Sequence, residues 1–234
     1  MVDQTLRITN TLSDPTRYSI YQYVLQKQTE VTVQEVADEF HIHPNVARLH
    51  LSKLEDVEII VSDLHKTGKG GRPGKVYMLS KQVVQLSFPK RDYQLLSDIA
   101  LKALSSLGDH GIQLLQEEGK KQGFEMIEDK LKHQKKNIQE LDFQDKIELF
   151  RDISSSVGYF PRIKKENNGY SLNFDIFNCP FKEKALHNSE QVCTMHNAYL
   201  NGAFQALFDV TEFKQFENMT SHCDTCRYRV NVTN

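Results

Sequence analysis

The sequence predicts a mostly α-helical protein that begins with a winged helix-turn-helix, continues through central helices and ends in an α+β domain. Three observations favour this fold class: apolar residues at helical spacing before residue 55, a glycine-rich basic segment between two short apolar runs, and four cysteines confined to the last third of the chain. We expect the three regions to span residues 1–90, 91–137 and 138–234.

Length and composition are those of an ordinary folded protein. A chain of 234 residues favours two domains over a single core, and 39% hydrophobic with 26% charged residues excludes a disordered or fibrous chain. Residues 1–10 lack the pattern of a signal peptide, and no run of about 18 apolar residues occurs. We therefore expect a cytoplasmic protein without a membrane partner.

The charge is unevenly distributed. Residues 1–91 hold 12 Lys and Arg against 10 Asp and Glu, whereas the remainder holds 17 against 21. Residues 66–91 contain seven basic residues and no acidic one, which indicates a local surface for phosphate groups. Charge runs are more often merely solvated. The position of this run within a motif therefore decides between a solvated loop and a phosphate-binding surface.

Three short helices are expected near the N-terminus. Asp14 can cap a helix that opens with Pro15, and Thr32 with Glu35 fits a capping box at the start of a second. After a tight connection over residues 41–43, Pro44 can open a third helix. Its inward stripe would comprise Ala47, His50, Leu51 and Leu54. Two short helices joined by such a turn indicate a helix-turn-helix.

The outward face of the third helix carries side chains that suit DNA. Arginine can pair with guanine, asparagine with adenine, and serine or lysine with the backbone. A solvated face is the alternative, and the hairpin that follows favours DNA. The predicted contacts on this helix are Asn45, Arg48, Leu49, Ser52 and Lys53.

A two-stranded hairpin should follow as the wing. Apolar runs at residues 57–64 and 76–79 flank a flexible basic tip, whose Lys69, Arg72 and Lys75 we expect to contact DNA. The glycines also suggest a phosphate loop, but Gly68 is one residue too far from Gly74-Lys75, and no Ser or Thr follows. Nucleotide hydrolysis is therefore rejected, and double-stranded DNA is the expected partner.

The central helices are candidates for dimerisation. Residues 93–107 carry an apolar stripe, and a charged helical stretch runs over residues 112–136. Because DNA half-sites are commonly paired, we expect a two-fold homodimer with these helices at its centre. The alternative is that they pack only on their own domain.

The C-terminal region alternates helices and strands. Helical spacing over residues 143–157 precedes a strand over residues 170–176, which ends just before Cys179. A helix beginning near Ser189 points Cys193 and His196 inward together. A last strand includes residues 228–232, so the region is α+β with its cysteines at the edges of elements.

The cysteine spacing favours a metal or cluster site over inert buried thiols. Thirteen, twenty-nine and two residues separate the four, and the final C-x-x-C places two thiolates in chelating geometry. The expected ligands are Cys179, Cys193, Cys223 and Cys226, for zinc or an iron–sulfur cluster. His196 is a reserve ligand or, more commonly for such a residue, a hydrogen-bonded core histidine; His187 and His222 are weaker candidates.

Catalysis is not expected. A thioredoxin-like C-x-x-C would start a helix after a strand, whereas this one leads into a strand. Neither a Ser/His/Asp set nor a pair of carboxylates has informative spacing. The sequence thus predicts neither an enzyme nor a small-molecule substrate.

Six segments resemble the SufR-type iron–sulfur-sensing repressors, a branch of the ArsR/DeoR-like winged-helix regulators. They are Asp14–Arg17, His43–Leu54, Gly71–Pro73, Asn178–Phe181, Cys193–His196 and Cys226–Val230. The resemblance implies a homodimeric repressor of iron–sulfur assembly genes that binds its operator with a 4Fe–4S or 2Fe–2S cluster and releases it when the cluster is lost or oxidised. Cys179, Cys193 and Cys226 match the ligand segments of the family, with Cys223 as the fourth. A winged-helix regulator with structural zinc and another effector is the alternative.

Overall fold

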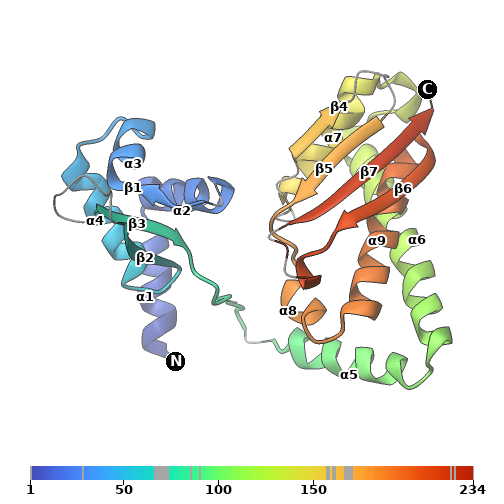
Figure 1. Cartoon of the computed structure of the whole chain (residues 1–234), viewed down its shortest axis with the longest axis horizontal. Helices are drawn as coiled ribbons and strands as arrows, with labels where there is room; N and C mark the ends of the chain where they lie inside the picture. Colours follow the sequence, from blue (N-terminus) through green and yellow to red (C-terminus); the bar gives the residue numbers. More distant parts are fainter. Residues whose placement is uncertain are drawn as a thin grey trace. The chain divides into compact units, whose positions relative to one another are not determined.

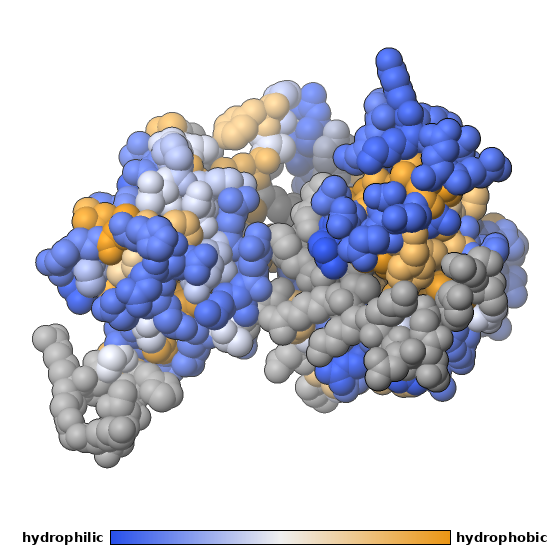
Figure 2. Space-filling model, turned by 90° about the horizontal axis from the view of Figure 1, so that it is seen from above, coloured by the Kyte–Doolittle hydropathy of each residue, from blue (hydrophilic) through white to orange (hydrophobic). Residues whose placement is uncertain are grey.

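The chain folds into two compact units, Met1–Arg91 (unit 1) and Asp92–Asn234 (unit 2), in a computed structural model (Figure 1). The structure describes residues 2–27, 29–65, 74–84, 86–89, 91–156, 159, 162–165, 171–221, 223 and 225–233. Within these residues, no helix has the length and apolar character needed to cross a membrane. Figure 2 shows hydrophobic patches that interrupt a mostly hydrophilic surface on the face drawn there.

Unit 1 combines four helices with a small antiparallel sheet. The helices are α1 (Val2–Leu12), α2 (Pro15–Lys27), α3 (Val33–Glu39) and α4 (Pro44–Glu55). The strands β1 (Val31–Thr32), β2 (Ile60–His65) and β3 (Gly74–Leu79) form a sheet in the order β1-β3-β2. The β2–β3 hairpin confirms the predicted pair of wing strands, while the tip between them, residues 66–73, lies outside the described residues.

The predicted helix starts are confirmed by their capping contacts. The Arg17 N–H donates to Asp14 Oδ1 at 2.8 Å, ahead of α2. Both bonds of the capping box are present, because the Glu35 N–H donates to Thr32 Oγ1 at 3.1 Å and the Thr32 N–H to Glu35 Oε2 at 2.7 Å. The ring Nδ1 of His43 accepts from the Asn45 N–H and caps α4. Local chemistry thus fixes where each helix begins.

Unit 2 places helices against one face of a four-stranded antiparallel sheet. The helical elements are α5 (Tyr93–Ser105), α6 (Asp109–Gln134), η1 (Ile138–Glu140), α7 (Phe143–Ser156), α8 (Lys182–Ala185), α9 (Ser189–Leu207) and η2 (Met219–Ser221). The strands β4 (Arg162–Lys165), β5 (Ser171–Ile176), β6 (Asp209–Glu217) and β7 (Cys226–Thr233) lie in the order β4-β5-β7-β6. The inward side chains of β5 and β7 pack with α6, α7 and α9 in one core. In this core the ring centroids of Phe174 and Phe204 lie 5.1 Å apart.

Helices α6 and α9 lie side by side, and glycines make this close approach possible (Figure 1). A Cβ on Gly123 would lie 1.9 Å from the carbonyl oxygen of Tyr199, and one on Gly202 would lie 2.0 Å from that of Lys120. Gly119 likewise faces Met195, whose carbonyl oxygen would lie 2.6 Å from an added Cβ. The predicted region 91–137 is therefore not separate from the cysteine-bearing region, because α6 is built into the same unit as α9.

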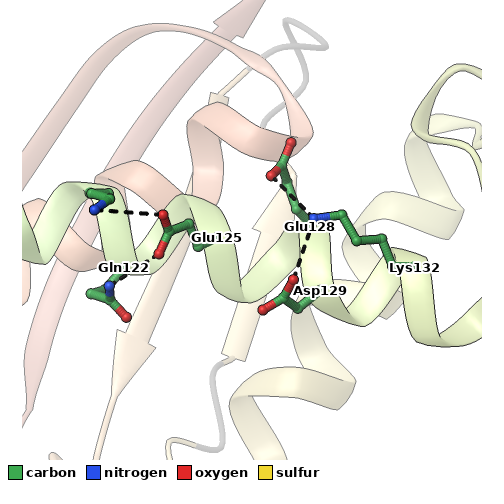
Figure 3. A network of polar contacts seen from close by, with 6 residues as sticks. Gln122, Glu125, Glu128, Asp129 and Lys132 are labelled. Atoms are coloured by element: carbon green, nitrogen blue, oxygen red, sulfur yellow. Dashed lines mark hydrogen bonds and ion pairs between the residues drawn. The ribbon is translucent and has the colours of Figure 1, made fainter.

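The opposite face of α6 carries a polar network (Figure 3). Lys132 Nζ lies 3.8 Å from the Glu128 carboxylate and 3.4 Å from that of Asp129, and Gln122 donates to Glu125 at 3.1 Å. Each contact between residues three or four apart stabilises an exposed helix by about 0.2–0.5 kcal/mol. This charged face explains why α6 shows only a weak apolar stripe in the sequence.

Helix α5 has no buried residue. Its Leu95, Leu96 and Ile99 are each more than half exposed, whereas Asp98 and Ser105 make polar contacts. Those two polar residues bind α8 and α9: the Lys184 ammonium contacts the Asp98 carboxylate, and Gln191 Nε2 donates to Ser105 Oγ at 2.7 Å. The helix thus attaches to unit 2 through polar contacts and leaves an apolar face uncovered within the described chain.

Candidate DNA-binding surface and cysteine cavity

The exposed face of α4 carries the predicted DNA contacts. Ala47, Leu51 and Leu54 are fully buried, which turns Asn45, Arg48, Leu49 and Lys53 outward and leaves Ser52 half-buried. Leu49 is 58% exposed although it is a large apolar residue. An exposed leucine next to arginine and one turn after asparagine suits a thymine methyl group next to polar base edges.

Arg48 is oriented before any ligand arrives. Its Nη1 donates to Asn45 Oδ1 at 2.9 Å, one turn away on the same helix face. This bond uses one guanidinium donor and leaves the other guanidinium donors and the Asn45 amide hydrogens available for base edges. The pair is therefore a candidate recognition group at the N-terminal half of α4.

Lys75 is engaged at the base of the wing. Its Nζ lies 2.6 Å from Glu55 Oε2 and 5.0 Å from the centre of the Tyr77 ring. Burial favours the neutral form of Glu55, but hydrogen bonds from Lys75 and Ser62 outweigh it and hold the pKa of this carboxyl below its usual value. The charge of Lys75 is thus neutralised in unit 1, which weakens its predicted role as a phosphate contact. The other predicted wing contacts, Lys69 and Arg72, lie outside the described residues.

Three of the four cysteines line one small cavity in unit 2. Cys179 follows β5, Cys193 lies in the second turn of α9, and Cys226 begins β7 directly opposite Ile176. The cavity measures about 20 Å³, and His196 and Tyr228 also line it. Cys179 and Cys226 are only 8% and 6% exposed, and the Met219 N–H donates to Cys226 Sγ at 3.4 Å. The fold therefore gathers thiols that are far apart in sequence.

Cys223 stands apart from this cavity. Its Sγ lies 3.8 Å from the carbonyl oxygen of Ser221, and the side chain is half-buried outside the cavity lining. Cys223 is thus left out of the lining of the cavity that the other three cysteines share. Of the weaker histidine candidates, His187 is exposed away from the cavity, and His222 lies outside the described residues.

Burial controls the protonation of the cavity. It raises the pKa of the Cys179 thiol to about 12, with a further contribution from the neighbouring Cys226 and Cys193, and it also raises the pKa of Cys226. Burial lowers the pKa of His196 to about 4, so this imidazole is neutral at physiological pH. The thiols of Cys179 and Cys226 are thus protonated in the metal-free protein, and a cation that binds them has to displace their protons.

The chemistry of these donors fits a thiophilic metal or cluster. Thiolate sulfur is the preferred ligand of structural zinc and of iron–sulfur clusters. The cavity has room for about one water molecule, and among the described residues no three Cys, His, Asp or Glu side chains converge closely enough to hold one ion. Binding of either group therefore requires the cysteine side chains to turn toward one another and the cavity to widen.

The hydrogen-bond partners of His196 could not be predicted from the sequence. Its Nε2 lies 2.8 Å from the Tyr159 hydroxyl, and its Nδ1 lies 3.6 Å from Cys179 Sγ. The only sequence signal was the inward position of His196 on α9, which predicts burial but names no partner. Tyr159 lies beyond the end of α7, in a segment without periodicity.

Comparisons with known proteins place unit 1 in a recognised class. Residues 12–63, from the end of α1 into β2, match the family described as a helix-turn-helix domain. Unit 1 therefore carries the helix-turn-helix domain of a DNA-binding transcription regulator. This match covers less than a quarter of the chain, so it defines the class of the N-terminal unit and not the function of unit 2.

The other comparisons add no argument about function. No curated protein matches the chain. A solved structure, trafficking protein particle complex subunit 3 from Naegleria fowleri covalently bound to palmitic acid, is similar at 14% sequence identity. The match covers 61% of this chain and 91% of that one, with a TM-score of 0.43.

Proposed function

We propose that this chain is a homodimeric transcriptional repressor of iron–sulfur assembly genes, whose operator binding depends on an iron–sulfur cluster in unit 2. The observation that carries the proposal is the meeting of Cys179, Cys193 and Cys226 at one cavity, in a chain whose other unit is a helix-turn-helix domain. These three cysteines would be ligands, and Cys223 is the candidate for the fourth. When bound, the cluster would supply sensitivity to oxidation and to iron supply.

Movement of the cysteines would be transmitted to α5 through neighbouring residues. Lys184, which contacts Asp98, lies in α8 just after Cys179, and Gln191, which binds Ser105, lies on α9 just before Cys193. Drawing the cysteines together would therefore shift the anchors of α5. Because α5 is the first helix after unit 1, its position would set where unit 1 is held, and so bias the population of DNA-competent molecules.

The second copy of the chain would cover the apolar face of α5. Of the two central helices, α6 uses its glycine face against α9 and its other face for polar contacts, whereas Leu95, Leu96 and Ile99 of α5 remain exposed. A two-fold axis beside α5 would bury this face against its own copy and pair two α4 helices for two DNA half-sites. This refines the expectation that both central helices lie at the dimer centre.

Anaerobic reconstitution tests the proposal. Protein purified without oxygen is supplied with ferrous iron and sulfide, its visible absorbance is recorded and its bound iron and sulfide are quantified. A DNA duplex selected from a random library is then titrated with both forms. Tighter binding by the loaded form is expected, and equal affinities would contradict control by the cluster.

Cysteine variants identify the ligands. Replacing Cys179, Cys193 or Cys226 singly by serine is expected to abolish or greatly reduce bound iron. Cys223→Ser is the matched comparison, because the same chemical change is made outside the cavity. Full iron binding by Cys223→Ser would exclude it as a ligand, whereas full binding by the Cys193 variant would contradict the proposed site.

Structural zinc is the second candidate, and the donor chemistry of the same cavity supports it. A zinc form is colourless and contains no sulfide. Metal analysis of the freshly purified protein therefore separates the two candidates. Zinc at one equivalent per chain, with no iron uptake on reconstitution, would replace the cluster in this proposal and leave the effector of the DNA-binding unit unassigned.

A further inference from the structure

Both ring nitrogens of His196 already have partners. Nδ1 lies 3.6 Å from Cys179 Sγ, Nε2 lies 2.8 Å from the Tyr159 hydroxyl, and the residue is only 4% exposed. A histidine binds a metal through the free lone pair of a ring nitrogen. His196 could therefore act as a ligand only by giving up one of these contacts.

Aromatic neighbours hold the imidazole in this orientation. The Tyr159 ring lies nearly parallel to it, at 10° with centroids 5.3 Å apart, and the Phe181 ring meets it edge-on at 5.2 Å. Phe181 lies two residues after Cys179, so the ring and the sulfur are positioned by the same short segment. Rotation of the imidazole away from Cys179 would also break the contact with Tyr159.

The direction of the hydrogen bonds follows from the partner at Nε2. Neutral imidazole has one N–H and one lone pair. Burial raises the pKa of Tyr159, so its phenol keeps a hydrogen to donate. If that hydrogen is donated to Nε2, the imidazole proton resides on Nδ1 and faces the sulfur of Cys179.

We propose that His196 is a positioning residue for Cys179: it donates an Nδ1–H hydrogen bond to the sulfur, is oriented by Tyr159, and is not itself a ligand. The hydrogen bond belongs to the metal-free protein as well. Its effect on a cluster rests on the proposed function, because hydrogen bonds to cysteine sulfur help set the reduction potential of iron–sulfur clusters. Removing the bond is expected to lower that potential, since a donor to sulfur stabilises the more negative, reduced cluster.

Nitrogen NMR of the metal-free protein tests the hydrogen bond directly. The protein is labelled with ¹⁵N-histidine, and the His196 ring signals are assigned by their loss in His196→Asn. A neutral ring with its proton on Nδ1 supports the proposal, and Tyr159→Phe is expected to shift the Nε2 signal most. A proton on Nε2 would overturn it. This measurement stands even if the protein binds no cluster, so the two proposals fail separately.

A pair of isosteric variants tests the role in the loaded protein. The asparagine amide in His196→Asn can donate from near the position of Nδ1, whereas the glutamine amide in His196→Gln reaches toward that of Nε2. After reconstitution with ferrous iron and sulfide, both variants are expected to bind as much iron as the parent protein. The reduction potential is expected to fall in His196→Gln and in Tyr159→Phe, and to stay near the parent value in His196→Asn.

Two outcomes would overturn the role in the loaded protein. Loss of iron from both His196 variants, while Tyr159→Phe retains it, would make His196 a ligand. Equal potentials in the parent, His196→Gln and Tyr159→Phe proteins would show that the contact does not act on the cluster. Urea denaturation of each variant identifies any that fail to fold, and Tyr159→Phe, which keeps the packed ring, then serves as the decisive variant.

Discussion

Replacing Gly123 by alanine should separate α6 from α9. The added Cβ would lie 1.9 Å from the carbonyl oxygen of Tyr199, whereas side-chain Cβ atoms in proteins essentially never approach closer than 3.0 Å. The helices therefore have to move apart by about 1 Å, the difference between these distances. The obstacle is backbone, so no side-chain rotation can relieve it.

Two opposing terms set the size of the effect. Overpacking a well-packed interface costs about 1–3 kcal/mol, and the rigid obstacle places Gly123→Ala at the upper end. Alanine is the better helix former by about 1 kcal/mol. We therefore expect the free energy of unfolding of unit 2 to fall by about 2 kcal/mol.

Urea denaturation followed by circular dichroism measures this loss, and hydrogen exchange in α9 assigns it to unit 2. Glu117→Ala, at an exposed position on the same helix, is the control and is expected to change little. If Gly123→Ala instead stabilised the protein by about 1 kcal/mol, helix propensity alone would be acting. That result would refute the close contact of the two helices.

Three further predictions concern other parts of the molecule. Arg48→Ala is expected to weaken binding of a selected DNA duplex by about 1–3 kcal/mol, measured by fluorescence anisotropy at fixed salt; unchanged affinity would exclude Arg48 as a base contact. Ile99→Glu is expected to turn a dimer into a monomer in sedimentation experiments, and a monomeric parent protein would contradict the dimer itself. The hydrogen bond from the Thr32 N–H holds the pKa of Glu35 below its ordinary 4.5, so its stabilising contribution is present above that pH and is lost as pH falls through the lower, folded-state pKa. Glu35→Gln should therefore be less stable than the parent to heat at pH 7, by about 1 kcal/mol or less, and equally stable in strong acid; a constant difference would be evidence against this bond.

The sequence predicted most elements that have one strongly buried face. Ala47, Leu51 and Leu54 of α4 are fully buried at helical spacing, and β5 alternates between buried and half-buried residues along its whole length. Capping residues such as Thr32 and Glu35 also predicted where helices begin. In such elements the spacing of apolar residues predicts which face is buried.

Two elements without such a face were missed. Strand β6 contains register shifts between Val210 and Glu212 and between Gln215 and Glu217, which break the two-residue period of a strand. Helix α1 buries only Ile8 and Thr11 among its described residues.

The cysteine site was predicted only in part, for a physical reason. That Cys179 and Cys226 meet depends on the pairing of β5 with β7, which sets Ile176 opposite Cys226. Sequence spacing carries no information on that pairing. Cys223, which is close to Cys226 in sequence, does not line the cavity that the other three cysteines share, and its role as a ligand stays a prediction.

The Glu55 carboxylate has a consequence for how unit 1 responds to ionic strength. It receives hydrogen bonds from Ser62 on β2 and Lys75 on β3, so it fastens the end of α4 to both wing strands. Counterion release on DNA binding follows the number of cations that reach phosphates, and Lys75 is already matched by an anion of its own protein. The affinity of unit 1 for DNA should therefore fall less with added salt than a count of its lysines and arginines suggests. Shape and base contacts should then contribute a larger share of the binding free energy.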